Sequence, residues 1–469
     1  MSSSRTSARL GTPVSRRIPR PLVALFTAGY LAPYLLPTIV GRLGDSLHLP
    51  PAQAGVIGSA LLMSSAAAGF TFAGRVDRIG PRTLARCGLL LAALGYGTAA
   101  ATSWVPLVVL GAMAGGFGSG TATTVAATGI AAQRDPHRAS TLGLLSVSAL
   151  AGALYLTLPH LGPGHALPFA AIALTALATW PATASLGQVV RPGAVEAESS
   201  APATPLPYRR TGLVLAGSMV CWSMAQNSLW GVSSRIGTDQ AGLTEVTVGA
   251  VFAVALGTAL VGVLGAGALG TRLGRAVPIG AGTALIACCI VLSARADGLA
   301  SFATGEIAWN TFYPVVLSYL IGLAASLDPR GRWAVLVGSA SSLGTACGPL
   351  TGSVLSQTAG YPAMGTTLAV LLLVLALPLT AVALHTSGRL LLPGTIRRRG
   401  VAPAALVAGV TGAQAGAVPQ PGTVEQPVVE ITVSTPQPVP TQDEFSTAGP
   451  RGGSALGQSS NANASTSAR

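Results

Sequence analysis

Apolar residues gather in twelve long runs along the chain, separated by short polar segments. A helix needs about 20 mostly apolar residues to cross roughly 30 Å of hydrocarbon. The runs therefore predict an all-α integral membrane protein with twelve transmembrane helices. The predicted spans are 21–40, 53–73, 83–102, 105–132, 141–161, 166–186, 212–233, 247–270, 277–294, 299–326, 333–356 and 362–385.

A polar, proline-rich segment, GQVVRPGAVEAESSAPATPLPYRR, separates the first six runs from the last six. We expect a disordered C-terminal tail, because its small and polar residues have little to bury. The first apolar run lacks a small-residue cleavage site, so it is interpreted as a span and not as a signal peptide. The predicted parts are a basic N-terminal tail (1–20), a six-helix bundle (21–186), a linker (187–211), a second six-helix bundle (212–385) and the tail (386–469).

Charge is scarce and one-sided. Only 9% of the residues are charged, against about 25% in soluble globular proteins, which excludes an ordinary soluble enzyme. All 27 basic residues are arginines, and they are scattered between apolar runs, so no nucleic-acid partner is expected. With both termini in the cytoplasm, 22 arginines lie inside, two more lie in the distant tail, and only Arg42, Arg235 and Arg295 lie outside. The positive-inside rule therefore predicts a multi-pass protein of the cell (inner, cytoplasmic) membrane with both ends cytoplasmic.

No cofactor or metal is expected. The five cysteines lie in apolar runs without a CxxC spacing, as small buried hydrophobes do. The chain also has no GxxxxGK[ST] motif, so ATP is not expected to be the direct energy source.

The two halves repeat each other. Arg78-Ile-Gly80, in the loop after the second run, recurs as Arg272-Leu-Gly274 at an offset of 194. Asp135-Pro136 recurs as Asp328-Pro329 at an offset of 193. Two matches at nearly one offset indicate an internal duplication, and therefore two pseudo-symmetric six-helix bundles.

These loops resemble the major facilitator superfamily of secondary transporters, whose signature between spans two and three is approximately G-x-L-x-D-R-x-G-R-R. The first copy departs from it at Ala73, Arg75 and Pro81, and the second has Thr271 in place of the acid. Matching residues in the first copy are Asp77, Arg78, Gly80 and Arg82, and those in the second are Gly267, Leu269, Arg272, Gly274 and Arg275. The resemblance covers about residues 21 to 390. It implies a transporter that works as a monomer on a small molecule, with spans one, four, seven and ten around a central cavity.

The repeated loops are interpreted as a cytoplasmic gate. Asp77 is placed at the N-terminus of span eleven, near Trp333, where unpaired amides and the helix dipole favour an anion. Arg78 is expected to pair with Asp135, and Arg272 with Asp328. The alternative is that these residues only anchor loops at the lipid headgroups.

Glu306, in the run GEIAWNTFYP, is the one charged residue well inside a predicted span. Seven residues from the start of span ten correspond to roughly 10 Å of depth. A carboxylate there is costly unless it faces a wet cavity, finds a partner or takes up a proton. The resemblance places Glu306 on the central cavity, so we predict that it is the protonation site of a proton-coupled cycle. The alternative is an interfacial carboxylate satisfied by Arg295 or water.

Other amide and aromatic side chains share helical faces in three cavity helices. They suit a substrate with a ring or extended apolar part and hydrogen-bonding groups. Each of them alone is also typical of a lipid-interface anchor or a helix-packing contact. The candidates are Tyr30, Tyr34, Trp222, Gln226, Asn227, Trp230, Trp309, Asn310 and Tyr313.

Glycine patterns mark two further spans. Span four has Ala112 and Ala114 where the family often carries an arginine in R-x-x-x-G-x-G, so the usual coupling arrangement is not expected. Span eleven contains a motif similar to one that the family's antiporters place in span five, and it predicts a kinked, closely packed helix. The residues of that motif are Gly344, Gly348, Pro349 and Gly352.

The leading functional prediction is a secondary transporter, working by alternating access, that couples protons to efflux of a small amphipathic metabolite or drug. Proton-coupled uptake of a nutrient uses the same parts and stays open. A membrane-embedded transferase is disfavoured, because the five histidines lack an acid at a catalytic spacing. A non-transporting receptor is the remaining alternative.

Overall fold

The computed structural model describes residues 20–133, 135–186, 206–269, 274–328 and 331–387, and no strand occurs among them. The N-terminal tail (1–19), most of the linker, Arg272 and the C-terminal tail from 388 lie outside the described residues. Helices of the first half are α1 (Arg20–Tyr34), α2 (Leu36–Leu47), α3 (Pro51–Phe72), α4 (Val76–Ile79), α5 (Pro81–Ala101), α6 (Val105–Ala131), α7 (Pro136–Leu161), α8 (Ala166–Thr179) and η1 (Trp180–Ser185). Those of the second half are α9 (Arg209–Arg235), η2 (Ile236–Gln240), α10 (Glu245–Leu269), α11 (Ala276–Ala294), α12 (Leu299–Leu327) and α13 (Arg332–Ser387).

Prolines and glycines set several of the helix boundaries. Helices α3, α5 and α7 begin at proline, whose fixed φ suits the first helical position. The repeated glycines Gly80 and Gly274 both adopt positive φ, 93° and 69°, a conformation that L side chains rarely adopt. Each loop thus contains a glycine at a position whose backbone conformation favours glycine.

The first span is bent. Helices α1 and α2 meet at an angle of 47° around Leu35. Pro37 has no N–H, so the carbonyl of Pro33, four residues earlier, loses its intrahelical partner. The bend therefore leaves a backbone acceptor inside the protein.

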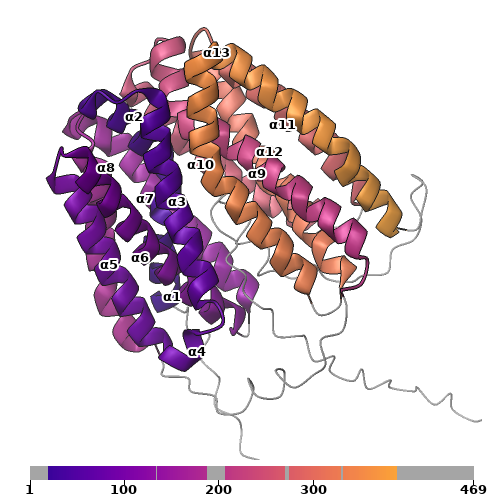
Figure 1. Cartoon of the computed structure of the whole chain (residues 1–469), viewed down its shortest axis with the longest axis horizontal. Helices are drawn as coiled ribbons and strands as arrows, with labels where there is room; N and C mark the ends of the chain where they lie inside the picture. The colour runs from indigo at the N-terminus through magenta and orange to yellow at the C-terminus, as the bar shows by residue number, and fades with distance from the viewer. Residues whose placement is uncertain (1–19, 134, 187–205, 270–273, 329–330, 388–469) are drawn as a thin grey trace, which may run out of the picture. The chain divides into compact units, whose positions relative to one another are not determined.

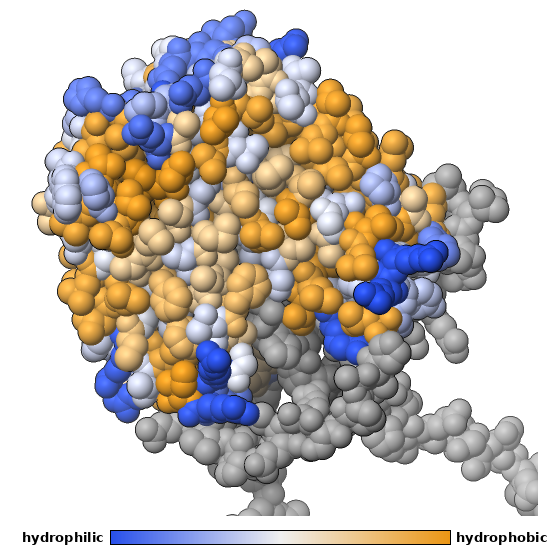
Figure 2. All heavy atoms as spheres, viewed as in Figure 1, coloured by the Kyte–Doolittle hydropathy of each residue, from blue (hydrophilic) through white to orange (hydrophobic). Residues whose placement is uncertain are grey.

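Nine helices of the described chain are long and apolar enough to cross a membrane, and ten if the bent α1–α2 pair is one span. Helix α13 counts once, although Gly360 interrupts it with non-helical backbone between the predicted spans 333–356 and 362–385. Helix α9 is not in that set, because serine and amide side chains lower its hydropathy. Apolar side chains cover the middle of the visible face (Figure 2), as a bilayer requires. The total of twelve spans stays a prediction.

Packing between the halves follows the repeat. Helix α3 packs against α13, and α10 packs against α7. An offset of 194 carries α3 onto α10, and α7 onto the first part of α13. The two contacts are therefore equivalent under the duplication (Figure 1), as expected of pseudo-symmetric bundles.

Two ends of this helical assembly are distinguished below. The α2 end is where α2 and α9 finish and α10 and α12 begin; the α4 end is where α4 lies and α9 begins (Figure 1). The predicted topology places the α2 end outside the cell and the α4 end in the cytoplasm.

Candidate functional site

Glu306 lies in α12 and is fully buried. Its Oε1 accepts hydrogen bonds from the hydroxyls of Ser233 in α9, at 2.9 Å, and Ser293 in α11, at 2.6 Å. Within the described part of the chain, Oε2 has no hydrogen-bond partner. Arg295, the alternative partner, bonds to Thr366 instead. The carboxyl group is thus oriented by two neutral hydroxyls and not neutralised by an arginine.

The neighbouring glycine explains how Ser293 reaches this carboxylate. A Cβ on Gly305 would lie 2.7 Å from the backbone N of Ser293, too close for any side chain. Helix α11 can therefore approach α12 closely only because residue 305 is glycine. This approach brings the Ser293 hydroxyl to Glu306.

Helices α9 and α12 run antiparallel and pair their aromatic residues in a ladder. Trp222 stacks on Tyr313 with ring centroids 5.3 Å apart, and Tyr313 stacks on Trp309 at 5.4 Å. Trp309 in turn stacks on Trp230 at 5.8 Å. Four of the predicted cavity residues therefore form one continuous ring surface, and all four are buried.

The predicted amides divide between this surface and helix packing. Gln226 Oε1 accepts from Trp309 Nε1 at 2.5 Å, while Gln226 Nε2 lacks a partner in the described residues. Asn227 donates instead to Ser223 O and Thr345 Oγ1, so it helps to join α9 to α13. Asn310 donates to the backbone carbonyl of Glu306 in its own helix. Gln226 is thus the amide with a free donor beside the rings.

The two predicted tyrosines of α1 are buried next to the α1–α2 bend. Trp230 Nε1 donates to the carbonyl of Pro33 at 3.1 Å, the acceptor that Pro37 leaves free. Tyr155 of α7 donates to the carbonyl of Tyr34 at 2.5 Å. The ring of Tyr30 packs against that of Phe26 within α1, with the two planes tilted by 36°. The bend therefore joins α1 to the aromatic ladder of the other half through the Pro33 carbonyl, and to α7 of its own half through the Tyr34 carbonyl.

The residues of the span-eleven motif pack closely against neighbouring helices. A Cβ on Gly344, Gly348 or Gly352 would overlap atoms of α9, so these glycines permit close contact between α13 and α9. Pro349 lies against Gly231 of α9 and Gly58 of α3. Leu350 N donates to Ser59 Oγ of α3 at 2.9 Å. The motif thus lies where α13 contacts α9 of its own half and α3 of the first half.

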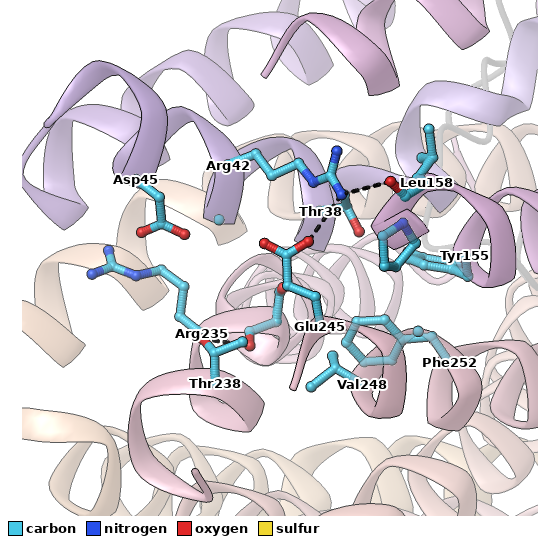
Figure 3. A pocket seen from close by; sticks show the side chains of 14 residues that line it. Thr38, Arg42, Asp45, Tyr155, Leu158, Arg235, Thr238, Glu245, Val248 and Phe252 are labelled. Carbon is cyan, nitrogen blue, oxygen red and sulfur yellow. Dashed lines mark hydrogen bonds and ion pairs between the residues drawn. The ribbon is translucent and has the colours of Figure 1, made fainter. Parts of the chain in front are cut away.

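A cavity of about 20 Å³, roughly room for one water, lies between the halves at the α2 end. Arg42 of α2 is 3% exposed, and its Nη2 bonds to Glu245 Oε2 of α10 at 2.9 Å and to the carbonyl of Leu158 at 3.1 Å. The side chains of Asp45 and Arg235 lie beside this pair (Figure 3). Ala52 N adds a bond across the halves to Gln357 Oε1 at 2.8 Å.

Sequence reasoning did not identify the Arg42–Glu245 pair. The sequence marked Arg42 only as one of the three arginines on the predicted outer side of the membrane. Its partner is 203 residues away, and no local spacing connects the two residues.

The predicted gate residues lie at the α4 end. Asp77 and Arg78 are exposed, and no ion pair joins Arg78 to Asp135 among the described residues. Asp135 caps its own helix by accepting from Arg138 N at 3.0 Å. Asp328 is buried and pairs with Arg332, four residues on, at 2.7 Å.

Trp333, the residue expected near Asp77, donates to the carbonyl of Pro207 at 2.7 Å, just before α9 begins. Arg82 is partly buried. Burial lowers the pKa of Arg275 from its usual value, but a guanidinium stays charged. Within the described residues, no group of three or more His, Cys, Asp or Glu side chains could hold a metal ion.

Comparison with known proteins agrees with this architecture. A family model described as Major Facilitator Superfamily matches residues 22–327, from α1 to the end of α12. No curated protein matches the chain.

Three solved transporter structures share the fold. The POT family transporter PepTSo is 11% identical, with a TM-score of 0.64 over 80% of this chain and 99% of that one. The nucleoside transporter NupG is 13% identical, with a TM-score of 0.62 over 78% and 100%. The human organic anion transporter MFSD10 (TETRAN) is 18% identical, with a TM-score of 0.56 over 78% and 100%. At these identities the likeness concerns the fold alone. The chain belongs to the Major Facilitator Superfamily, and it is a multi-pass membrane transporter and not an enzyme.

Proposed function

We propose that this secondary transporter couples the uptake of protons to the export of a small amphipathic molecule across the cell membrane. Glu306 is the residue that takes up and releases the proton. The observation that carries the proposal is one fully buried carboxylate without a cationic partner among the described residues, next to a ring surface formed by α9 and α12. One chain supplies both halves, so a monomer suffices.

The surroundings of Glu306 suit reversible protonation of its carboxyl group. An ionised carboxylate buried without a counter-charge is costly, and protonation of Oε2 removes that cost. The hydroxyls of Ser233 and Ser293 hold Oε1 in place in both forms. Gain or loss of the proton therefore changes the charge of the site without changing its framework.

Alternating access supplies the conformational half of the cycle. The halves are bonded together at the α2 end, which the predicted topology places outside. This conformation is therefore closed to the outside. Opening outward requires those bonds to break while the α4 end closes, and Asp77, Arg78 and Asp135 then become the latch of the cytoplasmic gate together with Arg272 and Asp328.

Flux through proteoliposomes under an imposed pH gradient tests the coupling. The probes are fluorescent amphipathic dyes of positive, negative and zero charge, and both directions are measured. We expect a proton gradient to accelerate movement of at least one dye in the opposite direction, and Glu306→Gln to abolish that acceleration. The control is Asp297→Asn, which alters an exposed acid near the start of the same helix and should leave coupling intact.

Full proton dependence in a folded Glu306→Gln protein would remove Glu306 from the coupling mechanism. Acceleration of dye and protons in the same direction would instead indicate uptake by symport.

A further inference from the structure

The region around Glu306 carries one uncompensated charge. Three charged side chains are buried among the residues whose burial the structure describes: Arg42, Glu306 and Asp328. Arg42 pairs with Glu245 and Asp328 pairs with Arg332, whereas Glu306 has only hydroxyl partners. A ligand that brings a positive charge to Oε2 would complete the site, and an anionic ligand would be repelled.

The ring surface beside this charge supports the same choice of ligand. Three of the six tryptophans of the chain, Trp222, Trp230 and Trp309, lie in the ladder with Tyr313. Aromatic faces attract cations and stack on flat rings. A carboxylate at one end of such a surface is complementary to an aromatic cation.

Free donors lie farther along the ring surface. Trp222 Nε1 and Gln226 Nε2 are buried without partners in the described residues. Both groups only donate, so a ligand satisfies them with an acceptor oxygen. Trp222 stacks on Tyr313, which is seven residues from Glu306 along α12, or about 10 Å of helix. The site therefore places an anion at one end of the ring surface, the Trp222 donor at the other end, and the Gln226 donor between them beside Trp309.

We infer that the substrate of this cluster is an aromatic organic cation that carries a hydrogen-bond acceptor roughly 10 Å from its charged nitrogen. This rests on the proposed function, since it takes the Glu306 cluster as the place where substrate binds. The rings now pack against one another, so the cation enters when α9 and α12 separate, and its charge competes with the proton for Glu306.

Binding without any gradient tests this inference separately from transport. The protein is the full chain in lipid nanodiscs, and the readout is fluorescence anisotropy at mildly alkaline pH. The probes are the methyl ester of rhodamine, a cation, and the methyl ester of fluorescein, its anionic oxygen analogue with the same rings and ester. We expect the rhodamine ester to bind more tightly by about tenfold or more.

Two variants assign that preference to residues. Glu306→Gln keeps the shape of the side chain and should remove most of the preference for the cation, while affinity for the fluorescein ester changes little. Trp309→Leu removes a ring face and should weaken both dyes, whereas Trp104→Leu, at a tryptophan that is 65% exposed, should change neither.

Equal or tighter binding of the fluorescein ester by the natural protein would overturn the inference without reference to any variant. Undiminished affinity for the rhodamine ester in folded Glu306→Gln protein would do the same. Binding of the cation without proton-dependent flux would leave this inference standing and contradict the proton coupling proposed above. Proton-dependent flux of uncharged dyes alone would leave the proton coupling standing and contradict this inference.

Discussion

Polar side chains at the α2 end join the two halves, whereas at the α4 end Asp135 and Asp328 bond to residues of their own half. Arg42 bonds to Glu245, and Trp230 bonds to the Pro33 carbonyl, both across the halves. At the other end, Asp135 caps its own helix and Asp328 pairs with Arg332 four residues on. The difference shows which contacts define the conformation: bonds at the α2 end must break before that end opens, while those at the α4 end can persist through the movement.

The largest effect is expected from Arg42→Ala. It leaves the Leu158 carbonyl and the Glu245 carboxylate without their shared donor. Loss of one partner of a fully buried pair costs about 3–5 kcal/mol, but Glu245 is 37% exposed, so we expect about 2 kcal/mol. The α2 end should open more often.

Labelling of a reporter measures that opening. Thr38→Cys, in a background with the native cysteines replaced by serine, lines the cavity and should react with an impermeant maleimide about tenfold faster after Arg42→Ala. The control is Arg295→Ala, which removes an exposed arginine whose bond stays within the second half. An unchanged labelling rate would mean that the Arg42–Glu245 pair does not hold this end closed.

A smaller effect is expected from Trp230→Phe. The variant keeps a ring but leaves the Pro33 carbonyl without a donor, which should lower the free energy of unfolding by about 1 kcal/mol. Pro37→Ala supplies an N–H to that same carbonyl, so Trp230→Phe should cost clearly less in the Pro37→Ala background. Denaturant unfolding of the unaltered protein, the two single variants and the double variant gives the coupling free energy between Trp230 and Pro37. Equal costs in both backgrounds would disprove that Trp230 compensates for the bend.

The smallest effect on stability is expected from Asp77→Asn at the α4 end. Its side chain is exposed, so the free energy of unfolding should change by less than about 0.5 kcal/mol. If Asp77 belongs to the cytoplasmic latch, the flux of a transported dye should nevertheless fall several-fold, because closure of that end loses a charged contact. Flux equal to that of the unaltered protein would leave these loops as headgroup anchors only.

Helical spacing accounts for some contacts of the Glu306 cluster and not for others, and that the cluster binds substrate stays a prediction. The faces of α9 and α12 follow from helical spacing, and Trp222, Gln226 and Trp230 do meet Trp309 and Tyr313. Asn227 follows Gln226 directly in the sequence, and it faces α13 because one step along a helix turns a side chain by about 100°. The serines that hold Glu306 were not predicted, because a hydroxyl in an apolar run gives no sign of what it faces.

The features that the sequence predicts depend on residues close together in the chain, whereas the contacts that it misses join distant residues. Hydropathy, arginine bias and the repeated loops depend on residues close together in the chain, so the sequence alone determined a duplicated membrane transporter with one carboxylate inside a span. Only the tertiary structure decided that Arg42 meets Glu245, that Trp230 compensates for Pro37, and that both of these bonds join the halves. Those contacts join residues about 200 positions apart, and their partners are set by how the helices pack and not by any spacing along the chain.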